Sequence, residues 1–260
     1  MVAEAFCVSQ TFAAAPRRQF TTDRHYLLYA TSGSMRLEAD GKMWALPPAR
    51  AALIAAGQPV QVTLTTTVIA CSALFDVSFM PAPDAALTVF DMSPLARELI
   101  LHCGSWTDRD TPLDPYGRQI FLALAGVAGK LAATPSRAVM PAPGSRGLAR
   151  AMALTEQRVS GPLDFEAIAT EVGMTPRTLA RRFATEMGMT WRQALRRLRM
   201  IRALELLTDE SSSITAIAFA VGYGSLSAFN AAFHDFVGET PTAYRKRFRG
   251  AATPVGLQIG

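Results

Sequence analysis

The sequence predicts an α+β protein of two domains. A small β-barrel with flanking helices precedes an all-α domain, in which a long helix joins two helix-turn-helix units. Between residues 20 and 80, short apolar segments alternate with turn residues, as is typical of strands. From Ser93 onward the apolar residues follow a helical period. A stretch rich in Pro, Gly and Ser separates the two regions.

The first region contains short strands at close spacing, which favour a small barrel or sandwich. Asp40-Gly41 is a hairpin signal between two of the strands. The expected strands are 25–30, 35–39, 42–46, 60–64 and 68–74.

Two helices are expected after the strands. Ser93-Pro94 is a helix start, because proline is favoured at the first helical position. One face of that helix carries Leu95, Leu99, Ile100 and Cys103. A second helix, over 116–132, carries an apolar stripe that serves either as core or as a homodimer interface, and the sequence leaves both open. The stripe consists of Ile120, Leu124, Val127 and Leu131.

The expected domain boundaries follow from these patterns. The first domain covers 1–132, a linker 133–147, the second domain 148–250 and a C-terminal tail 251–260.

The net charge of +5 is unevenly distributed. Residues 1–140 contain 11 Lys and Arg and 11 Asp and Glu, whereas residues 141–260 contain 15 and 10. The whole positive excess therefore lies in the second region, which suggests that this region alone meets a polyanion.

The cysteines and the N-terminus indicate a soluble, cytoplasmic protein. Cys7, Cys71 and Cys103 are too few and too widely spaced for a disulfide framework or a metal-binding pair. The N-terminus lacks the features of a signal peptide. No apolar run reaches the ~18 residues that a membrane span needs, so no membrane partner is expected.

The second region contains a partial duplication. Ile168-Ala169-x-x-Val172-Gly173 recurs 49 residues later as Ile217-Ala218-x-x-Val221-Gly222. After one inserted residue the match continues with an offset of 50, as far as Thr190 and Thr240. Each copy predicts a short helix, a tight turn and a second helix, the arrangement that places a helix in the major groove of DNA.

In the first copy, Gly173 supplies the turn, Thr175 the N-cap and Pro176 the first helical position. Leu179, Phe183 and Met187 form the expected buried face. Arginines on the opposite face can donate two hydrogen bonds to guanine. We expect base contacts from Arg177, Thr178 and Arg181, and phosphate contacts from Arg182 and Thr185.

In the second copy, Gly222 and Ser225 have the equivalent places, and Phe229, Phe233 and Phe236 form the expected buried face. The outward face has no arginine, which predicts a smaller share of the sequence readout. We expect base contacts from Ser227, Asn230 and Ala231, and phosphate contacts from Ser225 and His234.

A helix over 191–208 is expected to join the two units. Its length of ~27 Å is near the separation of successive major grooves. A last helix begins at Thr240-Pro241 and brings Arg245 and Lys246 toward phosphates.

Residues 148–249 resemble the DNA-binding domain of the AraC/XylS family of bacterial transcription regulators. The match runs from Ile217 through Gly222-Tyr223, Ser225, Ser227, Phe229 and Phe233 to Gly238, Pro241 and Tyr244-Arg245. Family members often carry arginine where this chain has Ala231. The resemblance implies an activator whose partners are double-stranded promoter DNA and RNA polymerase.

The first region resembles the cupin-like sensor barrel of that family, through Tyr29-x-x-x-Gly33 and Trp44-x-Leu46-Pro47-Pro48. The resemblance implies a small-molecule effector or dimerisation through this barrel. The sequence does not name the effector. Metal cupins need two or three converging histidines, and this barrel offers only His25, so we expect no metal and no cofactor. The expected pocket groups are His25, Tyr29, Arg36, Trp44 and Arg50.

Two other classes of protein remain as alternatives. The first is an enzyme, either a metal-dependent cupin or a DNA-repair alkyltransferase with an activated cysteine. The expected histidine ligands and cysteine partners are missing, so no catalytic residue is predicted. The second is an interaction module whose barrel binds a protein or a second copy.

Overall fold

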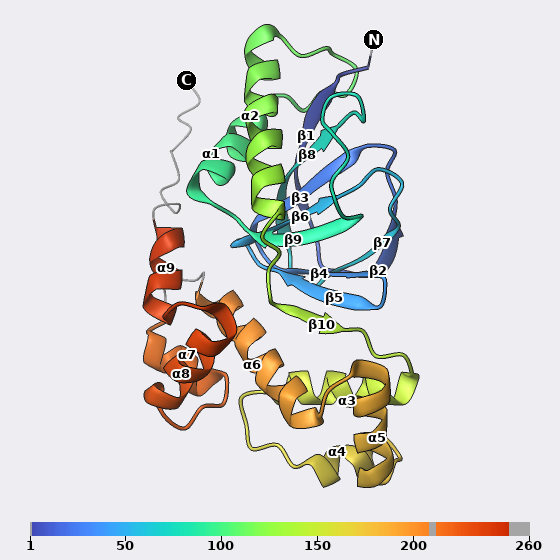
Figure 1. Cartoon of the computed structure of the whole chain (residues 1–260), viewed down its shortest axis with the longest axis vertical. Helices are drawn as coiled ribbons and strands as arrows, with labels where there is room; N and C mark the ends of the chain where they lie inside the picture. Colours follow the sequence, from blue (N-terminus) through green and yellow to red (C-terminus); the bar gives the residue numbers. More distant parts are fainter. Residues whose placement is uncertain (1, 208–211, 250–260) are drawn as a thin grey trace.

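A computed structural model describes residues 2–207 and 212–249. The N-terminal region contains two five-stranded antiparallel sheets and two helices, and the C-terminal region is helical (Figure 1). Thr208, Gly250 and the expected tail 251–260 lie outside the described residues.

The first sheet has the order β1-β8-β3-β6-β9, and its neighbouring strands are antiparallel. Its strands are β1 (Ala5–Phe12), β3 (His25–Ser32), β6 (Arg50–Ile54), β8 (Val68–Phe75) and β9 (Leu87–Asp91).

The second sheet has the order β10-β5-β4-β7-β2 and is also antiparallel. Its strands are β2 (Ala15–Phe20), β4 (Met35–Ala39), β5 (Lys42–Leu46), β7 (Val60–Leu64) and β10 (Val139–Pro141). The five expected strands all form, with β4 and β5 paired across the Asp40-Gly41 turn. Five further strands, β1, β2, β6, β9 and β10, were not predicted.

The central strands of the first sheet are largely buried on both faces, and the strand period separates the two faces. Leu27 and Tyr29 of β3 pack with the helices, whereas Leu28 and Ala30 pack against residues of the second sheet. All five residues of β6 are buried, so β6 lacks the polar alternation that marks a half-exposed strand.

Helices α1 (Pro94–Cys103) and α2 (Pro115–Ala132) cover the outer face of the first sheet (Figure 1). The Ser93 hydroxyl caps α1 by accepting from the Ala96 N–H. Ile100 and Cys103 are buried as expected and Leu99 is partly buried, but Leu95 is 58% exposed. The buried face of α1 begins at Ala96, one residue after Leu95.

The apolar stripe of α2 is largely core. Leu124 is fully buried within the chain, so the interface interpretation of this residue is wrong. Ile120, Val127 and Leu131 are partly buried against the same core. The centre of the buried face is rotated toward Phe121, Ala125 and Ala128.

The segment 133–147, expected as a linker, contains β10, which pairs with β5. Met140 of β10 and Ala49 share a buried cluster with Leu148 and Met152 of the helical region. Arg36 of β4 also forms an ion pair with Glu156 of that region. The two regions therefore contact each other directly.

Seven helices form the described C-terminal region (Figure 1). They are α3 (Arg146–Gln157), α4 (Phe165–Glu171), α5 (Pro176–Met187), α6 (Trp191–Leu207), α7 (Ile214–Ala220), α8 (Leu226–Val237) and α9 (Pro241–Arg249). In α6, Leu198 and Ala203 are buried, while Leu195 and Leu206 are only partly buried.

Across residues 2–207 and 212–249, no helix is both long and apolar enough to cross a membrane. The same residues contain no group of three or more His, Cys, Asp or Glu side chains that could hold a metal ion.

Candidate nucleic-acid interface

The first helix-turn-helix unit is α4 and α5. Gly173 has φ 71°, in the region that favours glycine, and turns the chain after α4. The Thr175 hydroxyl accepts a hydrogen bond from the Thr178 N–H at 3.2 Å, and Pro176 begins α5. The turn and cap therefore start this helix at a fixed direction from α4.

Helix α5 has one buried and one exposed face. Leu179, Phe183 and Met187 are buried, as expected. Arg177 and Arg181, one turn apart, are exposed, and no described residue forms an ion pair or side-chain hydrogen bond with either guanidinium. Both groups are therefore available to a ligand.

Three other residues expected to contact DNA from α5 are used partly or wholly within the fold. Thr178 is half-buried and shares a hydrogen bond of 2.9 Å with the Thr175 hydroxyl. Thr185 is exposed but donates its hydroxyl to the Arg181 carbonyl at 3.0 Å. Arg182 donates to Ser145 Oγ at 2.7 Å and pairs with Glu186 at 3.6 Å. Because Ser145 caps α3, Arg182 ties α5 to α3, which argues against the expected phosphate contact.

The second unit, α7 and α8, repeats this geometry. Gly222 has φ 84°, and the Ser225 hydroxyl accepts from the Ala228 N–H at 3.2 Å. Phe229 and Phe233 are fully buried, but Phe236 is only half-buried, and the Arg197 guanidinium lies 5.6 Å from its ring centre. The expected contact residues Ser227, Asn230, Ala231 and His234 are all exposed.

The last helix differs from the expectation. Lys246 is exposed, but Arg245 is only 7% exposed and follows Tyr244, which is fully buried. Tyr244 and Arg245 are adjacent and both lie on the inward face of α9, which argues against the expected phosphate contact from Arg245.

Most arginines of α6 hold the helical region together. Arg196 pairs with Asp235 of α8 at 2.8 Å, and Arg202 pairs with Glu205 at 2.7 Å. Arg199 donates to the Val159 carbonyl at 3.3 Å and lies over the Tyr223 ring. Arg197 donates to the carbonyl of Arg137, which precedes β10, at 2.8 Å.

The residues expected to line one effector pocket are not gathered in one place. Tyr29 packs with the helices on one face of the first sheet, whereas Trp44 packs between the sheets. Arg36 faces the helical region, where it pairs with Glu156. The expected common pocket is therefore wrong, because strand alternation sends neighbouring positions to opposite faces.

The two remaining pocket candidates are held by internal hydrogen bonds. His25 is buried, and its Nδ1 accepts from the Ala56 N–H at 3.1 Å; burial lowers its pKa. Arg50 is 2% exposed and pairs with Asp91 at 3.2 Å. Both side chains stabilise the fold at the ends of their strands.

The cysteines are buried and lie near each other. The Cys7 and Cys71 Sγ atoms are 3.7 Å apart. Burial raises the pKa of Cys103 to about 12, and the hydrogen bond with Cys71 together with burial raises the pKa of Cys7. The raised pKa values disfavour Cys7 and Cys103 as the nucleophile of an alkyltransferase. The hydrogen bond with Cys7 lowers the pKa of Cys71, which is also buried.

A cavity of about 650 Å³, which was not predicted from the sequence, lies between α2 and the first sheet. Its walls come from segments far apart in the chain, among them Leu53, 79–85 and α2. The glycines Gly126 and Gly129 within an apolar helix were the signal that could have indicated it.

Known proteins similar to this chain share the helix-turn-helix region. The helix-turn-helix domain family matches residues 168–247. The HTH-type transcriptional regulator NimR of Escherichia coli K12 is 27% identical over 224 residues, covering 85% of this chain and 79% of NimR. The transcriptional activator RhaR of Pectobacterium carotovorum is 33% identical over 90 residues, covering 35% of this chain and 32% of RhaR.

A solved structure of a Chromobacterium violaceum transcriptional regulator with an AraC-type DNA-binding domain has 31% identity and a TM-score of 0.39. The match covers 42% of this chain and 94% of that one.

The sequence matches and the paired helix-turn-helix units define a DNA-binding transcription regulator. In this region the chain resembles regulators of the AraC/XylS family. The named relatives are transcription regulators, a class distinct from enzymes.

Proposed function

We propose that the chain activates bacterial promoters by placing α5 and α8 in successive segments of the major groove. The observation that carries this proposal is the exposed arginine pair of α5, whose guanidinium groups have no partner among the described residues. Arg177 and Arg181 read bases, with guanine as the favoured partner. The protein acts in the cytoplasm and contacts RNA polymerase at the promoter.

Phosphate contacts fix the position of the domain on the duplex. Exposed groups near the two reading helices serve this role. A phosphate contact needs a side chain that reaches the DNA backbone and carries a positive charge or a hydrogen-bond donor, but it needs little shape complementarity. We assign it to Thr185, Ser225, His234 and Lys246, and no longer to Arg182 or Arg245.

The N-terminal region, with its two sheets, acts as a cupin-like sensor or dimerisation domain. Its direct contacts with the helical region support a change in domain orientation as the regulatory step. These contacts include the Arg36–Glu156 ion pair and the hydrogen bond from Arg197 to the Arg137 carbonyl.

The test of DNA recognition is a pull-down of fragmented genomic DNA from the host, followed by sequencing. We expect enrichment of a shared motif of ~16–20 base pairs, spanning two adjacent major-groove segments. An absence of enrichment, both with and without cell extract as a source of effector, would contradict the proposal.

Dimerisation is tested separately, through α2. Val127 is partly buried, so Val127→Lys should lower the apparent mass in solution if this face joins two copies. Leu124→Lys serves as the core control and should unfold the domain, because Leu124 is fully buried. A Val127→Lys variant with unchanged mass and stability would exclude this face as the interface.

A further inference from the structure

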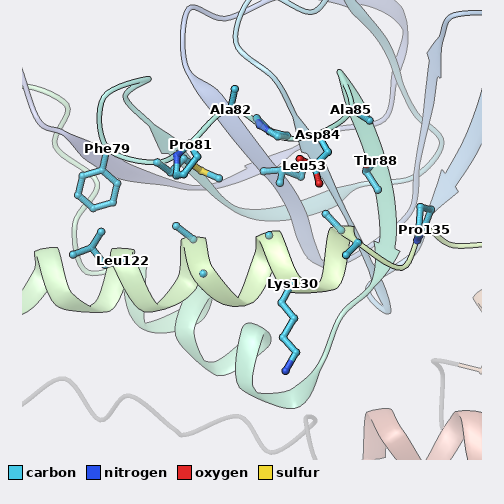
Figure 2. A pocket seen from close by; sticks show the side chains of 17 residues that line it. Leu53, Phe79, Pro81, Ala82, Asp84, Ala85, Thr88, Leu122, Lys130 and Pro135 are labelled. Carbon is cyan, nitrogen blue, oxygen red and sulfur yellow. The ribbon is translucent and has the colours of Figure 1, made fainter.

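The cavity between α2 and the first sheet has the size of a small-molecule site. Figure 2 shows α2 on one side and Leu53 with the segment around Phe79–Ala85 on the other. Its volume of about 650 Å³ lies within the range of sites that enclose drug-sized ligands. None of the expected effector-pocket residues lines it.

The cavity exists because α2 presents small residues to it. A Cβ atom added at Gly126 or at Gly129 would meet no atom within 4 Å. Glycine within a helix costs about 1 kcal/mol relative to alanine. Both glycines are exposed and neither is required by close packing, so a larger side chain at either position has room to enter the cavity that they line.

The walls of the cavity are mainly apolar. Leu53, Phe79 and Met80 each have less than a tenth of their surface exposed, and Leu122 contributes from α2. Such walls bind an aliphatic or aromatic group by removing apolar surface from water.

One polar group on the sheet side lacks a partner. Thr88 is only 8% exposed, and among the described residues no group forms a hydrogen bond with its hydroxyl. Thr88 pairs with Leu53 across β6 and β9, so both side chains face α2 (Figure 2). A ligand with a hydrogen-bonding group at this end would give the Thr88 hydroxyl a partner.

The charged groups around the cavity favour a cation. Asp84 lines the cavity beside Thr88 (Figure 2), and no described residue forms an ion pair with its carboxylate. Lys130 is also at the edge, but its side chain extends away from the cavity, on the far side of α2 (Figure 2). A carboxylate ligand would therefore meet Asp84 without a compensating cation.

We propose that this cavity binds a small molecule with an apolar body and a primary amine. The apolar body lies against Leu53 and Phe79, above the glycines of α2. The ammonium group donates hydrogen bonds to the Asp84 carboxylate and the Thr88 hydroxyl. Binding itself does not depend on DNA recognition, whereas its regulatory consequence rests on the function proposed above.

The test uses two probes with the same apolar body and opposite charge, 4-phenylbutylamine and 4-phenylbutyrate. Each is titrated into the full chain and followed by calorimetry and by NMR. We expect saturable binding of the amine and at least about tenfold weaker binding of the carboxylate, because the Asp84 carboxylate attracts the ammonium group and repels the carboxylate probe.

Variants locate the binding site. Gly126→Leu should abolish binding by filling the cavity, and its thermal unfolding checks that it folds. Ala123→Leu, on an exposed position of α2 outside the cavity, is the matched control and should bind like the parent. Thr88→Val keeps the shape of the side chain and should weaken binding about 2- to 10-fold. Asp84→Asn should reduce the preference for the amine.

The pocket proposal is overturned if the folded parent shows no saturable binding of the amine. It is also overturned if the carboxylate binds equally well, or if Gly126→Leu binds like the parent. Binding to the motif from the genomic pull-down, measured on the same samples, reports the proposed function separately. Loss of amine binding with intact DNA binding overturns only the pocket.

Discussion

The two helix-turn-helix units have nearly the same internal structure and different outward faces. Each has a turn glycine with positive φ and a hydroxyl N-cap, and the fully buried Phe183 of α5 matches the fully buried Phe233 of α8. On the outward side, Arg177 and Arg181 of α5 correspond to Ser227 and Ala231 of α8. The packing required for the motif is thus retained in both units, whereas the groups that can recognise bases differ.

The turns also differ in how closely they are packed. A Cβ at Gly222 would lie 2.7 Å from the Val159 carbonyl oxygen, whereas one at Gly173 would meet nothing within 4 Å. The second unit is therefore packed against the loop after α3 and against Arg199 of α6. We infer that the first unit is specialised for base recognition and the second for holding the domain in place.

The largest effects should come from the shared core. Phe183→Ala and Phe233→Ala should each lower the free energy of unfolding by about 3–5 kcal/mol, because each removes a fully buried ring. Urea denaturation of both variants measures this. A loss below about 1 kcal/mol in only one of them would contradict the similarity of the two cores.

The turn glycines should separate the units. Gly173→Ala should lower the free energy of unfolding by about 1–2 kcal/mol, through backbone strain alone. Gly222→Ala should lower it by about a further 1–3 kcal/mol, because the new methyl group meets the Val159 carbonyl oxygen. The comparison of their denaturation midpoints tests this order, and equal losses would refute the difference in packing.

The outward faces should differ in DNA affinity. Arg181→Ala should weaken binding to the preferred site by about 1–3 kcal/mol, and it should relax specificity at one base position. Fluorescence anisotropy on matched and mismatched duplexes measures both effects. Arg17→Ala, at an exposed residue of β2, removes the same charge far from the reading helices and is the control. An equal loss of affinity on every duplex would show that Arg181 contacts a phosphate and does not read a base.

The smallest effect should follow from the second reading helix. We expect Asn230→Ala to weaken DNA binding by less than about 1 kcal/mol, which is below the contribution of a well-formed bidentate contact to a base. The reason is that α8 offers no charged base-reading group. Anisotropy on the same duplexes measures this loss. A loss larger than that of Arg181→Ala would reverse the assigned roles of the two units.

The sequence predicted the helical region well because its signals are local. Gly173, Thr175 and Pro176 lie within four residues and fix a turn, a cap and a helix start. The buried face of α5 follows from periodicity alone. These features depend on neighbours in the chain, which a sequence displays directly.

Long-range partners could not be predicted in the same way. Arg182 contacts Ser145, 37 residues away, and Arg36 contacts Glu156, 120 residues away. Periodicity indicates the side of a helix or strand, but it does not show which element lies opposite. For the same reason β6, buried on both faces, lacked the alternation that marks a strand.

Selection of binding sites from a random DNA library by the parent, Arg181→Ala and Asn230→Ala tests the division of roles most directly. We expect the parent to select two segments about one helical turn apart. Arg181→Ala should lose a base preference in one segment only, and Asn230→Ala should leave the motif nearly unchanged. Selection of the parental motif by Arg181→Ala, or a greater loss of base preference in Asn230→Ala than in Arg181→Ala, would contradict this division of roles.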